Sequence, residues 1–232
     1  MQSAKNKIII VFTCALMLIG QLWYNNQRLS RVFYIISLII AVCSILMFYL
    51  SFEGRKPKER EIVLVCVLCA IVVASRVMFF FSPQIKPMTA ILIICAACYG
   101  KETGFLVGSI SMFVSNFFFS QGPFTPFCMV GMGLVGYFAG VLFYGKKPPL
   151  WALMLYGFLS VHLIYAAITN LSTVFLFTDN ITLPYIITVF GAALVFDLAH
   201  SISTVVFIAL LNKSLSGRFE RVKKRYGMLR AV

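Results

Sequence analysis

Charged residues are scarce in this chain, and acidic residues are the scarcest of them. Of 232 residues, 12% are charged and only 7 are Asp or Glu, whereas 61% are hydrophobic. A soluble domain carries about twice that charged fraction, so the composition is that of an integral membrane protein. The 20 Lys and Arg residues do not indicate a nucleic-acid partner. They lie where apolar segments end, which is the orientation signal of membrane proteins and not a basic groove.

Proline is absent from the interior of every long apolar segment, and no segment alternates in the manner of a half-buried strand. Both absences favour helices, and most segments approach the roughly 20 residues that a helix needs to cross a bilayer. The sequence therefore predicts an all-α integral membrane protein of eight helices, over Ile8–Tyr24, Val32–Phe52, Ile62–Phe81, Met88–Tyr99, Phe105–Phe119, Phe127–Tyr144, Leu150–Ile168 and Tyr185–Leu211.

No small-x-small cleavage site follows the first segment, although its basic start is similar to that of a signal peptide. We therefore interpret it as a retained transmembrane helix. If the N-terminus is cytoplasmic, 16 of the 20 basic residues lie on the cytoplasmic side. The positive-inside rule then predicts that both termini are cytoplasmic. The loops at 83–87, 120–126 and 178–184 face outward in this arrangement.

A charged linker at residues 55–61 divides the chain. We predict an N-terminal transmembrane hairpin over residues 1–54, a six-helix core over 62–211 and a basic cytoplasmic tail over 212–232. Because a hairpin contains two crossings, the core keeps its orientation with or without it.

One short polar stretch interrupts the apolar sequence, Ser120-Gln-Gly-Pro-Phe-Thr-Pro126. Its prolines restrict the backbone, its glycine frees it, and Gln121 and Thr125 carry hydrogen-bond donors and acceptors. Such a stretch suits either a preformed lip over a binding site or a tight turn between two helices. Its predicted place on the outer face, beside two other Pro-bearing loops and above Arg76, favours the lip.

Two adjacent segments are short, Met88–Tyr99 and Phe105–Phe119. The first spans only about 18 Å as a helix, which is less than the hydrocarbon core. Short segments often mark the binding site of a transporter, because irregular backbone is tolerated only within protein or beside a cavity. We expect the loop before Met88 to dip into the bundle and to complete the span of that helix.

Few ionisable residues lie within the apolar segments. Arg76 lies toward the outer end of its segment, and Asp197, His200 and His162 lie near the middle of theirs. Charge in lipid is costly unless it is paired or faces a cavity, so these residues predict a polar pocket with Arg76 near its mouth. The alternatives are structural bonds, such as one between Asp197 and His162, an Arg76 that reaches outward to the interface, or a proton relay.

Motifs for metals, nucleotides and catalysis occur only in unsuitable contexts. The pairs Cys66/Cys69 and Cys95/Cys98 have the spacing of zinc ligands but lie inside apolar helices, where thiolates are poorly solvated. We expect no metal, no cofactor and no enzyme activity. Glycines spaced by four residues predict close helix packing instead, at Gly100, Gly104 and Gly108, and at Gly136 and Gly140.

Two motifs resemble those of a known family. Ala70-x-x-x-Ala74 lies in the first core helix, and Gln121-Gly-Pro-Phe-Thr-Pro126 follows the third. Together with six core helices they are similar to the substrate-binding S components of energy-coupling factor (ECF) vitamin importers. The resemblance covers roughly residues 61–211, and the extra N-terminal hairpin departs from it.

The resemblance implies a multi-pass protein of the bacterial plasma membrane that binds a vitamin with high affinity and has no ATPase of its own. The absence of a P-loop is consistent with this. It also implies partners, a transmembrane T subunit and two cytoplasmic ATPases, with Ala70 and Ala74 at the T-subunit contact. The candidate substrate-binding residues are Arg76, Phe80, Gln84, Lys86, Asn116, Gln121, Phe124, Thr125, Met129, Tyr165, Asp179, Tyr185 and Asp197.

The expected pocket is rich in aromatic residues and holds few charges, which suits a flat and largely neutral ring system. The loop is similar to that of the cobalamin group, so a corrinoid is the leading substrate from the sequence. A queuosine precursor or riboflavin is the alternative. From other classes, a stand-alone proton-coupled transporter and an assembly protein stay open.

Overall fold

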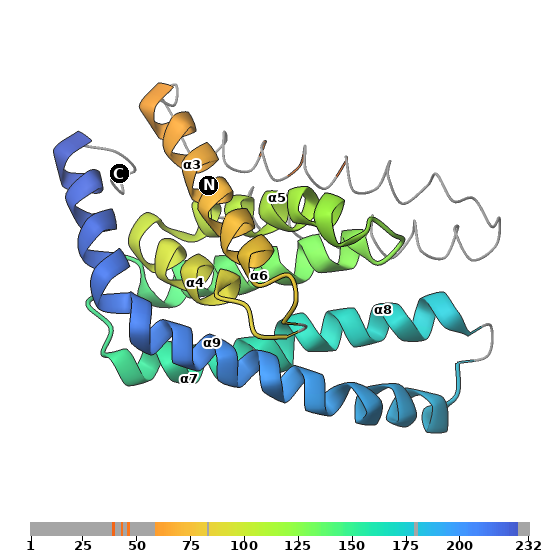
Figure 1. The fold of residues 1–232 in the computed structure, drawn as a ribbon. Coiled ribbons are helices and arrows are strands. Elements are labelled where there is room, and N and C mark those ends of the chain that lie inside the picture. The colour runs from red at the N-terminus through yellow and green to blue at the C-terminus, as the bar shows by residue number, and fades with distance from the viewer. Residues whose placement is uncertain are drawn as a thin grey trace, which may run out of the picture.

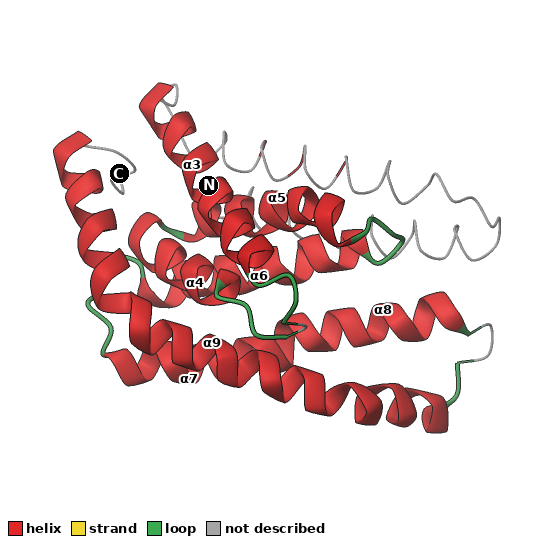
Figure 2. Cartoon of the chain, in the orientation of Figure 1, coloured by secondary structure: helices red, strands yellow, loops and turns green. Residues whose placement is uncertain are grey.

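The computed structural model describes residues 59–82, 84–178 and 181–226, together with positions 39, 43 and 46. Over these residues the chain is helical throughout and contains no strand (Figures 1 and 2). The expected helices Ile8–Tyr24 and Val32–Phe52 lie almost entirely outside the described residues, so the count of eight stays a prediction. The described elements are α3 (Glu59–Met78), α4 (Met88–Tyr99), α5 (Lys101–Phe119), α6 (Thr125–Phe143), α7 (Leu150–Ser160), the π-helix η1 (Val161–Ala166), α8 (Ala167–Phe177) and α9 (Leu183–Tyr226).

Within this part of the chain, 5 helices are long and apolar enough to cross a membrane, namely α3, α5, α6, the continuous α7–η1–α8 and α9. The helix α4 has only 12 residues. The expectation that its successor is also short is wrong, because α5 begins at Lys101 and has 19 residues. A single residue, Gly100, separates the two helices. Its φ of 99° lies in the left-handed region that favours glycine, and this allows α5 to start at once.

Two helices extend beyond their apolar segments. The helix α9 continues past Leu211 to Tyr226, and α7–η1–α8 continues past Ile168 to Phe177. The added part of α9 contains six Lys and Arg residues, which are good helix formers, and no proline. Hydropathy marks the part of a helix that lies in lipid, and helix propensity determines how far the helix continues.

The short helix α4 lies at the centre and contacts α3, α5, α6, α7 and α9 (Figure 1). All of its residues except Ala97 are buried, because a helix that is apolar on every side has to be enclosed. The loop that precedes α4 also enters the bundle. The backbone N–H of Lys86 donates to Ser203 Oγ at 3.1 Å, near the middle of α9, and Phe79 packs edge-on against Phe207. The predicted dip of this loop is confirmed.

The helices α5 and α6 pack backbone to backbone. A Cβ atom at Gly108 would lie 2.5 Å from the carbonyl oxygen of Met132, and Gly104 and Gly136 would each overlap the other's carbonyl group. The glycine spacing therefore predicts this packing correctly. It also sets the loop between the two helices against the end of α5, where the candidate site lies.

Candidate functional site

The loop between α5 and α6 is held by the side chain of Thr125, which is fully buried. Its hydroxyl donates to Gln121 Oε1 at 2.9 Å. The same oxygen accepts hydrogen bonds from the Gly122 N–H and from Asn116 Nδ2, each at 3.2 Å. Gln121 Nε2 in turn donates to the carbonyl oxygen of Phe113 at 2.9 Å. The loop is therefore rigid and internally hydrogen-bonded, as the lip interpretation requires.

These bonds also alter the role expected for two residues. The polar atoms of Gln121 and Thr125 pair with the loop itself and with α5. Both side chains therefore position the loop, and each of their polar atoms has at least one partner there. The polar residues of the loop are therefore explained by the hydrogen bonds that fold it, and their contact with a substrate stays a prediction.

Arg76 lies in the last turn of α3 and points toward α5. Its Nη1 donates to Asn116 Oδ1 at 2.7 Å and to Ser115 Oγ at 2.5 Å, and it lies 3.8 Å from the sulfur of Met112. Asn116 thus joins the guanidinium to Thr125. Among the described residues the other nitrogens of Arg76 have no hydrogen-bond partner, so donors remain available to a ligand.

Two cations lie over one aromatic ring. Arg76 Cζ is 4.4 Å and Lys86 Nζ is 4.2 Å from the centroid of Phe119, and the Phe80 ring lies 5.0 Å from the same ring. Contacts of this kind contribute about 0.5–2 kcal/mol each. Burial and the positive charge of Arg76 lower the pKa of Lys86 from 10.5 to about 8. We call Arg76, Phe80, Lys86, Asn116 and Phe119 the cation–aromatic cluster.

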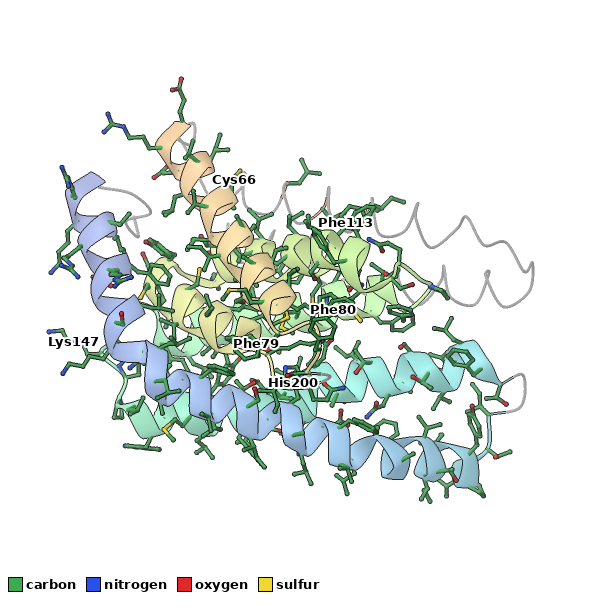
Figure 3. All side chains as sticks on the ribbon, viewed as in Figure 1. Cys66, Phe79, Phe80, Phe113, Lys147 and His200 are labelled. Carbon is green, nitrogen blue, oxygen red and sulfur yellow. The ribbon has the colours of Figure 1, made fainter. Side chains whose placement is uncertain are left out.

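A second polar group lies where the inserted loop meets α9. Thr89 Oγ1 and His200 Nε2 are 3.0 Å apart, and both residues are buried. The Tyr165 ring meets the His200 ring edge-on at 5.5 Å. Figure 3 labels Phe79, Phe80 and His200 near the middle of the view. This group extends the polar interior from the cation–aromatic cluster toward the centre of the bundle.

Tyr165 and His162 lie in the π-helix η1, which widens the turn between α7 and α8. Such turns occur frequently at functional sites because they redirect side chains. Here His162 Nδ1 lies 3.0 Å from Ser201 Oγ, and the Tyr165 hydroxyl points toward Cys128. No local sequence signal predicts a π-helix in this segment.

Three of the intramembrane ionisable residues have separate side-chain partners, and their role as the floor of one pocket stays a prediction. Asp197 accepts a hydrogen bond from Asn170 Nδ2 at 2.8 Å, His200 pairs with Thr89, and His162 pairs with Ser201. The alternative of structural interhelical bonds is present, with Asn170 in place of His162 as the partner of Asp197 and with Ser201 as the partner of His162. Ser201 Oγ also donates to the backbone carbonyl oxygen of Asp197, so Ser201 contacts both residues.

The other predicted site residues are distributed over this end of the bundle. Met129 is fully buried, and its carbonyl oxygen accepts from Ser109. Phe124 is 36% exposed at the loop, and Gln84 and Tyr185 are partly exposed. Asp179 lies outside the described residues. Whether any of them contacts a substrate stays a prediction.

Ala70 and Ala74 are exposed on α3, on a different face from its buried residues Leu68, Val72 and Ser75. The alternative that these alanines pack inside the bundle is therefore wrong for the described part of the chain. The exposed side chains leave a shallow surface on which another helix can approach closely.

Sequence reasoning missed several residues of the site, namely Thr89, Ser115, Asn170, Ser201 and Ser203. One signal was present for Ser115. Ser111 and Ser115 are four residues apart and Ser109 and Asn116 seven apart within an otherwise apolar segment, and this helical spacing indicates a polar stripe facing the interior. Thr89 and the serines of α9 carry no such signal, because an isolated hydroxyl in a membrane helix also bonds to its own backbone.

The described residues contain no group of three His, Cys, Asp or Glu side chains that could hold a metal ion. Cys66 is exposed, whereas Cys95 and Cys98 are buried.

Comparison with known protein families identifies a match. The family model of the ECF-type riboflavin transporter S component matches residues 56–217, which is well over half of the chain. No curated protein matches the chain.

Proposed function

Because the chain belongs to the family of ECF-type riboflavin transporter S components, we propose that it binds riboflavin at the cation–aromatic cluster and delivers it across the membrane. Members of this family are transport subunits and not enzymes. The family match does not support the corrinoid expected from the loop, and riboflavin is at least as consistent with it. The corrinoid was expected from an aromatic pocket and from the resemblance of the loop, and an aromatic pocket suits the flat ring of riboflavin equally.

The observation that carries the proposal is the arrangement around Phe119. A flat conjugated ring needs an aromatic wall and a few donors for its ring nitrogens and carbonyl oxygens. The rings of Phe80 and Phe119 supply the wall. Arg76 supplies unused N–H donors, and Lys86 supplies an ammonium group. The buried loop around Thr125 holds Asn116, and through it Arg76, in a fixed position.

By family, such a subunit works with a transmembrane T subunit and two ATPases, and we propose the same partners here. The exposed surface at Ala70 and Ala74 supports this part of the proposal. The distribution of Lys and Arg supports an orientation with the loop at 120–124 outside and the C-terminal end of α9 in the cytoplasm.

The test is a titration of the purified chain with riboflavin, followed by flavin fluorescence and by calorimetry, with cobalamin as the competitor. We expect tight, one-to-one riboflavin binding that cobalamin does not displace. Arg76→Gln should weaken it by about tenfold or more through the loss of charged hydrogen bonds. The matched control is Arg218→Gln, an exposed arginine of α9. Tighter binding of cobalamin would reverse the substrate assignment, and binding of neither would refute it.

A further inference from the structure

A cavity of about 480 Å³ lies at the opposite end of the bundle from the cation–aromatic cluster. The end of α4, the loop between α6 and α7, the start of α7 and the last turns of α9 enclose it. Its interior is apolar at Ile94, Ala97 and Leu153, and Asn212 and Ser216 add polar groups. Four lysines and one acidic residue complete the lining, namely Lys146, Lys147, Lys223, Lys224 and Glu220. We call this cavity the lysine pocket.

Two of the lysines are already anchored. Lys223 Nζ donates to the carbonyl oxygen of Cys98 at 2.8 Å and lies 4.3 Å from the centroid of the Tyr144 ring. Lys146 Nζ donates to the carbonyl oxygen of Leu142 at 2.8 Å. These bonds neutralise the carbonyl ends of α4 and α6, which carry partial negative charge.

The other two lysines of the pocket lack such anchoring bonds to the described residues. Within the part of the chain that the structure describes, Lys147 and Lys224 have no hydrogen bond or ion pair, and Glu220 forms no ion pair with any lysine of the pocket. In Figure 3, Lys147 lies at the end of the molecule where α9 finishes. Four positive charges against one negative charge give the pocket a surplus that an anion would balance.

The surroundings place the pocket at the level of lipid headgroups. Trp151, in the first turn of α7, is 67% exposed, and Tyr144 lies beside the same loop. Tryptophan and tyrosine gather at the boundary between hydrocarbon and water. A pocket at this depth, with an apolar interior and a basic rim, fits an amphipathic anion better than a fully hydrated one.

We propose that the lysine pocket binds a phosphate group, presented by the headgroup of an anionic phospholipid of the cytoplasmic leaflet. The ammonium groups of Lys147 and Lys224 contact the phosphate oxygens. Lys223 adds charge from the pocket wall, and the apolar interior receives the glycerol and the start of the acyl chains. This inference concerns the end of the bundle remote from the vitamin site and does not depend on which vitamin is bound.

The experiment is native mass spectrometry of the purified full chain with phosphatidylglycerol or phosphatidylcholine. We expect retention of phosphatidylglycerol to exceed that of phosphatidylcholine by on the order of tenfold, because each lysine near a membrane surface contributes to the attraction. The double variant Lys147→Gln/Lys224→Gln should lose this preference. The control Lys213→Gln/Arg218→Gln removes the same charge from exposed positions of α9 outside the pocket and should keep it.

A second variant tests the cavity without changing charge. Gly217 lines the pocket and a Cβ atom there would meet nothing within 4 Å, so Gly217→Phe adds a ring at the lining without overlapping a neighbour. We expect it to abolish the preference for phosphatidylglycerol, whereas Glu220→Gln should strengthen this preference.

Equal loss of the preference for phosphatidylglycerol in the control pair, or equal retention of the two lipids by the unaltered chain, would overturn the proposal. Competition by millimolar inorganic phosphate would identify soluble phosphate as the source, and its failure to compete identifies the lipid.

Discussion

The Thr125 hydroxyl forms three hydrogen bonds in a fully buried position, and it joins the loop at 120–124 to Asn116 on α5. Through Asn116 it also fixes the guanidinium of Arg76. The side chain therefore acts on the candidate site without lying at its surface. Its importance follows from the cost of leaving buried polar groups without partners.

We predict that Thr125→Ala destabilises the protein and weakens riboflavin binding by about tenfold or more, because it strands three polar groups at about 1–3 kcal/mol each. Thr125→Ser keeps the hydroxyl and should retain binding within a few-fold. Thermal unfolding and fluorescence titration of both variants check this. Equal loss in the two variants would show that the methyl group matters and the hydroxyl does not.

Lys86 gives the site a dependence on pH. Its pKa is lowered to about 8, so the side chain is charged below that value and neutral above it. The other charged or titratable groups near it are Arg76 on α3 and His200 on α9. Arginine stays charged throughout this range.

If the Lys86 ammonium group contacts the ligand, riboflavin affinity should fall as the pH rises through about 8. Titrations at several pH values check this, with Lys86→Gln as the comparison. In that variant the affinity should be lower at neutral pH and should change little between neutral pH and the alkaline end. An unchanged pH dependence in Lys86→Gln would assign it to another group.

Among the elements, α5 and α6 depend on glycine for their spacing. We predict that Gly136→Ala destabilises the protein by about 1–3 kcal/mol or more, since the new methyl group overlaps the backbone of Gly104. Gly191→Ala is the matched control, because a Cβ atom there meets nothing within 4 Å. It should leave stability unchanged or raise it slightly through helix propensity. Unfolding of both variants in one detergent gives the comparison.

The exposed face of α3 is the element that we assign to the T subunit. Ala70→Leu or Ala74→Leu should block riboflavin uptake by the assembled transporter and leave binding to the isolated chain unchanged. Ala192→Leu, an exposed alanine on α9, should affect neither. Uptake and binding assays on the same variants test this. Loss of binding together with uptake would mean that the face supports the bundle.

At the scale of the whole molecule, the arrangement of the ionisable residues bears on which energy source drives uptake. The residues proposed for proton coupling occur in separate hydrogen-bonded groups, with Arg76 at Asn116, Asp197 at Asn170 and His200 at Thr89. We therefore predict that uptake in vesicles requires the T subunit and ATP, and that a protonophore does not abolish it. Asp197→Asn should reduce uptake much less than Arg76→Gln. Uptake driven by a proton gradient without ATPases would contradict this.

Much of the fold was predictable from the sequence, and the reasons are physical. Apolar runs with prolines at their edges indicate helices, and Met88–Tyr99 was predicted with its observed bounds. The motif of the loop at 120–126 and the spacing of the glycines indicated a rigid loop and close packing, and both are present. The start of α5 and the end of α9 were not predictable from hydropathy, because their terminal residues are mostly polar and lie beyond the apolar runs.

The sequence by itself determined that this chain is a helical, multi-pass membrane protein with a polar loop, a short central helix and Arg76 within a membrane segment. Hydropathy, proline positions and charge depend on whether a segment lies in lipid or in water. They can therefore be interpreted without knowing which other segments pack against it. Only the tertiary structure decided that Gln121 and Thr125 bond within the loop, that Arg76 and Lys86 share Phe119, and that Asp197 pairs with Asn170. Hydrogen bonds and ring contacts depend on distances of a few ångströms between remote segments, and packing alone sets those distances.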